Sequence, residues 1–311
     1  MVLNIFSGLV PRAQKVVIYG AEGVGKTTLA AQFPNPLFID TEGGTSHLDV
    51  RRVDRPTTWS GLLAIVDEVA KTEGLCSTLV LDTADWAEQL ATTFVVDQSE
   101  NDKIKGIEDF GYGKGYIYLG EQFSKLLAAF DKCIAAGIHV VVTAHAKMRK
   151  FEQPDEMGAY DRWEMKLSKN VAPLLKEWAD MVLFCNYRTF VIETSDHKNK
   201  VQGGKRVIYT THHACWDAKN RWGLPDVIDM DYKCIAHCFQ TAMKPTKADD
   251  LRDSIREMLK TISSTEKELL DFAHGRGKLM DAQNLDGVDD DMLNKWVLKY
   301  WEQIAQAIKH I

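Results

Sequence analysis

Residues 15–28 read KVVIYGAEGVGKTT, a run rich in β-branched residues that passes through a glycine-rich turn into helix-forming residues. From Gly20 to Thr27 the stretch fits the pattern G-x-x-x-x-G-K-[ST] completely, between a predicted strand and a predicted helix. In that setting the glycines let backbone N–H groups close around a phosphate, and the start of the helix adds positive potential. The stretch therefore predicts a phosphate-binding loop (P-loop) for a nucleoside triphosphate.

The pattern also assigns roles within the loop. Lys26 is expected to reach the β- and γ-phosphates of ATP, and the Thr27 hydroxyl is expected to coordinate Mg²⁺. The residues predicted to bind the nucleotide are Gly20, Glu22, Gly23, Val24, Gly25, Lys26, Thr27 and Thr28.

Apolar strands and helical segments alternate along the first part of the chain. The predicted strands are 15–20, 36–40, 78–82, 139–144 and 181–187, and the predicted helices include 26–33, one capped by Thr57 or Thr58, and 116–136. Strands that are apolar along nearly their whole length are typical of a parallel sheet covered by helices on both faces. We therefore predict an α/β fold that ends in an antiparallel hairpin formed by residues 188–194 and 205–213.

Beyond Pro245 only helical patterns remain. One helix is predicted over 247–262. A second is predicted to follow a capping-box pattern at Ser263 and Glu266, and a third to begin in the acidic run 288–291. These patterns predict two domains, a core at 1–240 and a helical C-terminal subdomain at 241–311.

Composition excludes several classes of protein. The 311 residues are 45% hydrophobic and 26% charged, which excludes disordered and fibrous chains. No apolar run approaches the ~20 residues that span a bilayer, and the N-terminus does not resemble a signal peptide, so we expect a cytoplasmic protein without a membrane partner. The net charge of −6 argues against nucleic acid, yet residues 146–222 carry 14 basic and 10 acidic residues, a local positive balance.

The six cysteines are scattered and show no disulfide framework, which favours reduced thiols. A zinc site at Cys234 and Cys238 is the alternative. We favour buried thiols because the lone C-x-x-x-C spacing lies on an amphipathic stretch.

Three polar residues follow strands whose carboxyl ends should meet at one edge of the sheet, where open α/β folds bind ligands. Asp82 ends the strand TLVLD and is the candidate second Mg²⁺ ligand, with a turn-capping role as the alternative. Glu42 is placed to deprotonate the water that attacks the γ-phosphate, and Asp40 is its competitor. His145 is placed to hydrogen-bond the γ-phosphate, with a structural role as the alternative.

The order of these motifs resembles that of RecA-like ATPases. FIDTEGG resembles the RecA segment that carries the catalytic glutamate, which implies that role for Glu42. VVVTAHAK resembles the strand that ends in the RecA sensor residue, with His145 in place of the usual glutamine. IDTEGGTSHLDV, LDTADWAEQL and TTHHACWDAKNRWGLP further resemble a phage-encoded family of short RecA-like AAA-family ATP-binding proteins, related to single-strand annealing proteins built on a RecA core.

The resemblance implies that two loops face single-stranded DNA. One follows the sensor strand and interleaves cations, which follow phosphates, with aromatic rings, which stack on bases. Its candidate residues are Lys147, Arg149, Lys150, Phe151, Arg162, Trp163 and Lys166. The other, residues 106–116, is glycine-rich and aromatic, and a flexible connection is its alternative.

RecA-like ATPases usually complete their site with an Arg or Lys finger from a neighbouring subunit, which implies a homo-oligomer, either a ring or a filament. Candidates are Lys205, Arg206, Lys219 and Arg221. We prefer Arg221, and an ordinary salt bridge is the alternative.

The prediction is an Mg-ATP-dependent ATPase that binds single-stranded DNA and acts in phage recombination by strand annealing or pairing, in the host cytoplasm. A single-strand-binding protein is a candidate partner. The alternatives are a nucleotide-gated adaptor, a helicase or helicase loader in phage replication, and a small-molecule kinase.

Overall fold

The computed structural model describes residues 12–152, 158–193, 199–239, 248–278 and 282–308. Contacts within the chain divide it into two compact units, Met1–Ala242 and Met243–Ile311. The domain boundary predicted at residues 240–241 lies outside the described residues.

A nine-stranded sheet forms the centre of the first unit, in the order β3-β2-β4-β5-β1-β7-β8-β9, with β6 paired to β5. The strands are β1 (Lys15–Gly20), β2 (Pro36–Asp40), β3 (Arg51–Arg52), β4 (Thr78–Asp82), β5 (His139–Glu152), β6 (Ala159–Met165), β7 (Met181–Glu193), β8 (Asn199–Tyr209) and β9 (Val227–Asp229). Neighbours from β3 to β7 are parallel, whereas β8 and β9 join the sheet antiparallel. The predicted RecA-like α/β core with a terminal antiparallel hairpin is confirmed.

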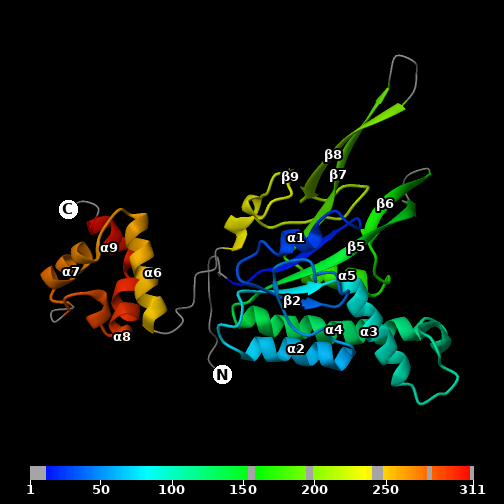
Figure 1. The fold of residues 1–311 in the computed structure, drawn as a ribbon, viewed down its shortest axis with the longest axis horizontal. Helices are drawn as coiled ribbons and strands as arrows, with labels where there is room; N and C mark the ends of the chain where they lie inside the picture. The colour runs from blue at the N-terminus through cyan, green and yellow to red at the C-terminus, as the bar shows by residue number, and fades with distance from the viewer. Residues whose placement is uncertain (1–11, 153–157, 194–198, 240–247, 279–281, 309–311) are drawn as a thin grey trace, which may run out of the picture. The chain divides into compact units, whose positions relative to one another are not determined.

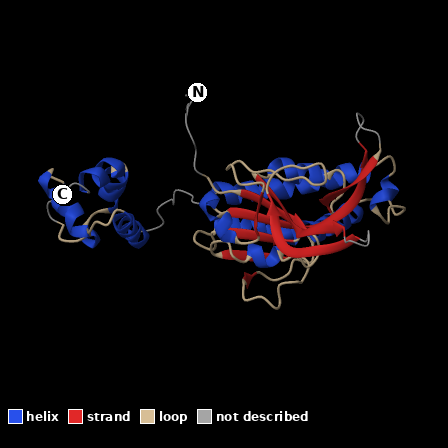
Figure 2. Ribbon diagram, turned by 90° about the horizontal axis from the view of Figure 1, so that it is seen from above, coloured by secondary structure: helices blue, strands red, loops and turns tan. Residues whose placement is uncertain are grey.

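Helices cover both faces of this sheet (Figure 2). They are α1 (Lys26–Ala30), α2 (Trp59–Lys71), α3 (Ala84–Asp97), α4 (Lys114–Ala135) and α5 (Val171–Trp178), with 3₁₀ turns η1 (Ile107–Phe110), η2 (Tyr232–Cys234) and η3 (Ala236–Phe239). Alternate side chains of β1 reach opposite faces. Val17 and Tyr19 join the core under α2 to α5, while Val16 and Ile18 join the core under α1, η2 and η3.

Local signals set the ends of some helices as predicted. Thr58 caps α2, its hydroxyl accepting the Gly61 N–H at 3.1 Å. Gly137, with a φ of 88°, follows the last residues of α4 in the left-handed conformation that glycine adopts without strain. The helix predicted over 26–33 is shorter and ends at Ala30, ahead of Pro34.

Two strands are longer than predicted, and the prediction of a loop directly after residue 144 is wrong. β5 runs on past His145 to Glu152 and pairs antiparallel with β6, from Ala146 opposite Met165 to Glu152 opposite Ala159. We call this ribbon the β5–β6 arm. β7 is likewise a single strand through Arg188 and pairs with β8 in a second ribbon. Both ribbons extend beyond the sheet in the same general direction (Figure 1).

The second unit is a small helical bundle. It contains α6 (Ala248–Thr261), α7 (Glu266–Gly275), η4 (Leu285–Gly287), α8 (Asp290–Met292), the π-helical turn η5 (Leu293–Leu298) and α9 (Trp301–Ile308). Its core includes Ile255, Leu269 and Val297. The capping box lies two residues later than predicted, because Thr265 and Glu268 make the reciprocal bonds while Ser263 takes a φ of 58° in the preceding turn. Within the described residues, no helix is long and apolar enough to cross a membrane.

Candidate active site

The P-loop follows β1 and leads into α1. Gly25 has a φ of 104°, which a residue with a Cβ adopts only with strain, and it forms the N-cap of α1. Lys26 is 5% exposed, and its ammonium group donates to the carbonyl oxygens of Gly20 at 3.3 Å and Ala21 at 3.1 Å. Burial lowers the pKa of Lys26. The loop therefore holds one buried ammonium group at the point where phosphates would enter.

Two oxygen-bearing side chains, those of Thr27 and Asp82, meet beside this loop. The Thr27 hydroxyl donates to Asp82 Oδ2 at 2.9 Å, and the Thr143 hydroxyl donates to the other oxygen of the same carboxylate. Asp82 is 1% exposed, and burial raises its pKa. A hydroxyl and a carboxylate are the hard oxygen ligands that Mg²⁺ prefers, so Thr27 and Asp82 fit a site for this ion.

The turn after β2 places the two candidate bases, Asp40 and Glu42, in different surroundings. The Asp40 carboxylate accepts N–H groups from Gly43, Gly44 and Thr45, and also the Thr45 hydroxyl at 2.7 Å. Burial would raise its pKa, but these hydrogen bonds lower it. All of its bonds hold the turn, whereas Glu42 remains one-third exposed in that turn. The geometry favours Glu42 as the base and gives Asp40 a structural role.

His145 lies opposite Gly20 in the register of β5 and β1, next to the first glycine of the P-loop. Its Nε2 lies 3.9 Å from Glu42 Oε2. On its other side, Nδ1 lies 2.8 Å from Asp85 Oδ2. Burial raises the pKa of Glu42, and the Asp82 and Asp85 carboxylates add to this, whereas His145 and Lys26 oppose it. A raised pKa suits a group that must take up a proton.

The four finger candidates lie at different places. A Cβ on Gly25 would come within 2.9 Å of the Arg206 guanidinium, so Arg206 lies directly against the P-loop of its own chain. Lys205 pairs with Asp229 at 2.6 Å. Arg221 and Lys219 lie far from this loop: Arg221 is 3.6 Å from Asp180, and Lys219 pairs through its backbone with Val182, at the amino end of β7. A role for Arg221 in a neighbouring subunit's site stays a prediction.

The residues predicted to contact DNA divide into two groups. Arg149, Lys150 and Lys166 are exposed, and half-buried Lys147 donates to the Leu167 carbonyl at 2.8 Å. Arg162 is buried, pairs with Asp217 and lies 5.0 Å from the ring of Phe151.

Trp163 packs against the apolar core, 6.1 Å from the ring of Phe184. The inclusion of Arg162 and Trp163 in a DNA surface is therefore wrong, because Arg162 is buried in an ion pair and the half-buried Trp163 is packed against the core. Phe151 is half-buried between Tyr160 and Arg162.

Three residues of the site carried no sequence motif. Thr143 lies within β5, Asp85 lies in α3, and Arg206 lies in β8 of the β7–β8 ribbon. The position of Asp85, three residues after Asp82 and in the first turn of α3, was the one local signal available. At the position of the alternative zinc site, Cys238 Sγ lies 3.5 Å from Nε2 of the adjacent His237. The described residues contain no group of three or more His, Cys, Asp or Glu side chains that could hold a metal ion.

The P-loop, the Thr27–Asp82 pair and the carboxylate on the neighbouring strand end define a RecA-like P-loop ATPase core. A family model described as an AAA domain matches residues 12–222, and the chain belongs to this family.

Among solved structures, a KaiC-like protein of the archaeon Pyrococcus horikoshii OT3 shares 14% identity, with a TM-score of 0.38 over 68% of this chain and 84% of that chain. The flagellar accessory protein FlaH of Methanocaldococcus jannaschii shares 12% identity, with a TM-score of 0.31 over 68% of this chain and 88% of that chain. No curated protein matches the sequence.

Proposed function

We propose that this chain is an Mg-ATP-dependent ATPase that binds single-stranded DNA and acts in phage DNA recombination by strand annealing or pairing. The observation that carries the DNA part is a hollow of about 870 Å³ at the base of the β5–β6 arm, lined by Lys147, two residues along the same strand from His145. ATP and DNA would thus contact neighbouring residues of β5.

The ATPase part follows from the site. Lys26 neutralises charge on the phosphates, and the P-loop N–H groups orient them. Mg²⁺, held by Thr27 and Asp82, would supply further charge neutralisation. A water attacks the γ-phosphorus and passes a proton to Glu42 while the bond from phosphorus to the bridging oxygen breaks, so that ADP and inorganic phosphate leave.

The lining of the hollow supports binding of a polyanion. It gathers basic side chains from β5 and from the segment between β6 and α5: Lys147, Arg149, Lys166 and Lys169. Burial and the neighbouring Arg149 lower the pKa of Lys147. Glu88 on α3 forms part of the same wall, but its carboxylate is occupied, accepting the Ser168 N–H at 3.0 Å.

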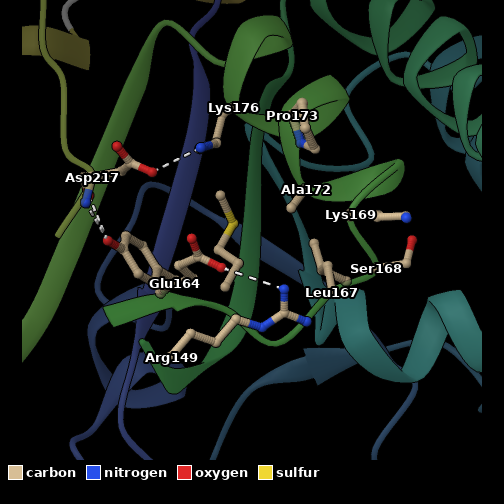
Figure 3. A pocket seen from close by; sticks show the side chains of 11 residues that line it. Arg149, Glu164, Leu167, Ser168, Lys169, Ala172, Pro173, Lys176 and Asp217 are labelled. Atoms are coloured by element: carbon tan, nitrogen blue, oxygen red, sulfur yellow. Dashed lines mark hydrogen bonds and ion pairs between the residues drawn. The ribbon is translucent and has the colours of Figure 1, made fainter. Parts of the chain in front are cut away.

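A smaller cavity of about 190 Å³ adjoins this hollow and shares Arg149, Ser168 and Lys169 with it (Figure 3). On its far side Lys176 is tied to Asp217 at 2.7 Å, and Arg149 lies 3.8 Å from Glu164. Arg149, Lys166 and Lys169 are all exposed, so we propose that the phosphate path runs along these three side chains.

Aromatic residues lie in and next to the wall of the larger hollow. Gly113 and Tyr116 line it, and Tyr112, in the turn before α4, is fully exposed. Base stacking on an exposed ring contributes about 1–3 kcal/mol per base. Tyr112 therefore supports the proposal that residues 106–116 form the second DNA-facing segment.

A nucleotide-gated adaptor is the second candidate, because the helical bundle is a separate compact unit with its own core. In that role the bundle would recruit a partner such as a single-strand-binding protein, and the chain itself would have little affinity for DNA. For the ATPase as proposed, a homo-oligomer would place several modestly basic subunits on one strand.

Charge reversal at the hollow tests the DNA proposal. The double variant Arg149→Glu/Lys166→Glu should weaken binding to fluorescent oligo-dT by about tenfold or more in anisotropy titrations, and it should flatten the salt dependence by about 0.7 per lost phosphate contact.

The matched control is Lys125→Glu/Lys233→Glu, which makes the same change in net charge at exposed positions outside the hollow. Equal losses in the two double variants would show a general charge effect and contradict the site. Weak, salt-independent binding by the wild type would favour the adaptor.

A further inference from the structure

Asp85 lies in the first turn of α3 and holds His145 by two contacts. Its Oδ1 accepts the backbone N–H of His145 at 3.0 Å, and its Oδ2 lies 2.8 Å from Nδ1 of the same residue. Asp85 is 6% exposed and the His145 side chain is 10% exposed. One buried carboxylate thus fixes both the backbone and the ring of the residue beside the P-loop.

The two contacts determine which ring nitrogen carries the proton. Burial would raise the pKa of Asp85, but its hydrogen bonds with His145 lower it below its ordinary value, so the carboxyl is ionised at neutral pH. An ionised carboxylate can only accept hydrogen bonds, which requires the proton on Nδ1. Nε2 is then directed to the opposite side, towards Glu42.

The distance between Nε2 and Glu42 Oε2, 3.9 Å, is too long for a direct hydrogen bond. Two acceptors at this spacing are suited to sharing one water molecule, which donates one hydrogen to each. A water held in this way has its lone pairs free to face a phosphorus atom. The arrangement resembles other catalytic sites in which a carboxylate orients a histidine through Nδ1.

We propose that Asp85 is a positioning residue that locks His145 with Nδ1–H towards itself and Nε2 towards Glu42, so that Glu42 and His145 hold the attacking water together. This inference rests on the proposed function, because it assumes that Glu42 is the base in ATP hydrolysis. As the water oxygen bonds to the γ-phosphorus and the bond to the bridging oxygen breaks, one proton passes to Glu42. The other stays on the transferred oxygen and is hydrogen-bonded to Nε2.

The first test is Asp85→Asn, which keeps the shape but allows the side chain to donate to Nδ1 and so favours the other tautomer. The ATP turnover number should fall by about 10- to 100-fold, as for other groups that orient a histidine. ATP affinity should change less than about threefold, because Asp85 does not line the P-loop. Asp97→Asn, an exposed acid at the end of the same helix, is the control and should behave as the wild type.

A double-mutant cycle separates positioning from a structural role. In a His145→Gln background there is no tautomer to select, so adding Asp85→Asn should lower turnover by less than about threefold. If Asp85→Asn lowers the turnover number by the same factor in that background as in the wild type, the proposal is overturned, since Asp85 would then act independently of His145.

A spectroscopic readout does not depend on the folding of the Asp85 variant. In ¹⁵N-histidine-labelled wild-type protein, with His145 assigned by comparison with His145→Gln, the ring nitrogen shifts should show the proton on Nδ1. A neutral ring protonated on Nε2 would overturn the proposal.

The proposed function can fail separately. If Glu42→Gln retains full turnover, the assignment of the base fails. If Glu42→Gln is inactive while Asp85→Asn is fully active, the inference about Asp85 alone fails.

Discussion

Replacing Glu42 with glutamine is expected to lower the rate of ATP hydrolysis by about 10²- to 10⁴-fold, because the amide cannot take the proton from the attacking water. ATP should still bind, since Glu42 lies in the turn after β2 and the P-loop with Lys26 is unchanged. Single-turnover hydrolysis of radiolabelled ATP, together with a titration by a fluorescent ATP analogue, measures the two effects separately.

The matched control is Glu73→Gln, which removes the same charge from an exposed position ahead of β4, at the opposite edge of the sheet. It should hydrolyse ATP as the wild type does. Normal turnover by Glu42→Gln would return Asp40 to consideration as the base. The four hydrogen bonds that Asp40 makes within the turn argue against that outcome.

Replacing Lys26 with alanine is expected to remove both binding and turnover. Its ammonium group is the buried positive charge of the P-loop, and loss of one such group costs about 10²- to 10³-fold in turnover. The fold should not suffer, because burial disfavours the charged form of Lys26 and the alanine variant no longer carries that cost. The measurement is thermal unfolding with and without Mg-ATP, which should raise the melting temperature of the wild type but not that of Lys26→Ala.

Lys71→Ala serves as the control, since Lys71 makes only an exposed ion pair with Asp67 on α2. This variant should keep the ATP-dependent rise in melting temperature. A similar rise in Lys26→Ala would mean that the nucleotide binds without the P-loop lysine, which would contradict the site as described.

Features determined by local sequence were predictable. The P-loop pattern places its glycines, lysine and threonine in one continuous segment, so a strand and a helix on either side suffice to locate it. Asp82 and Glu42 were found because the carboxyl ends of parallel strands meet at one edge. The choice between Asp40 and Glu42 required the turn itself, where Asp40 is occupied by three N–H groups and a hydroxyl.

Features determined by distant residues were not predictable. Arg149 and Arg162 look alike in the sequence, but they face each other across the β5–β6 arm, and only Arg162 meets Asp217, 55 residues further along the chain. The count of basic residues could not distinguish an exposed cation from a buried one. Asp85 likewise shows its role only through His145, which lies 60 residues away on another element.

The most direct test of the whole account is the steady-state rate of ATP hydrolysis with and without single-stranded DNA, measured across a series of salt concentrations. We expect DNA to stimulate hydrolysis, and the stimulation to weaken as salt releases the DNA. A rate that DNA does not change at any salt concentration, together with no salt-dependent DNA binding, would contradict the proposal of a single-stranded-DNA-dependent ATPase.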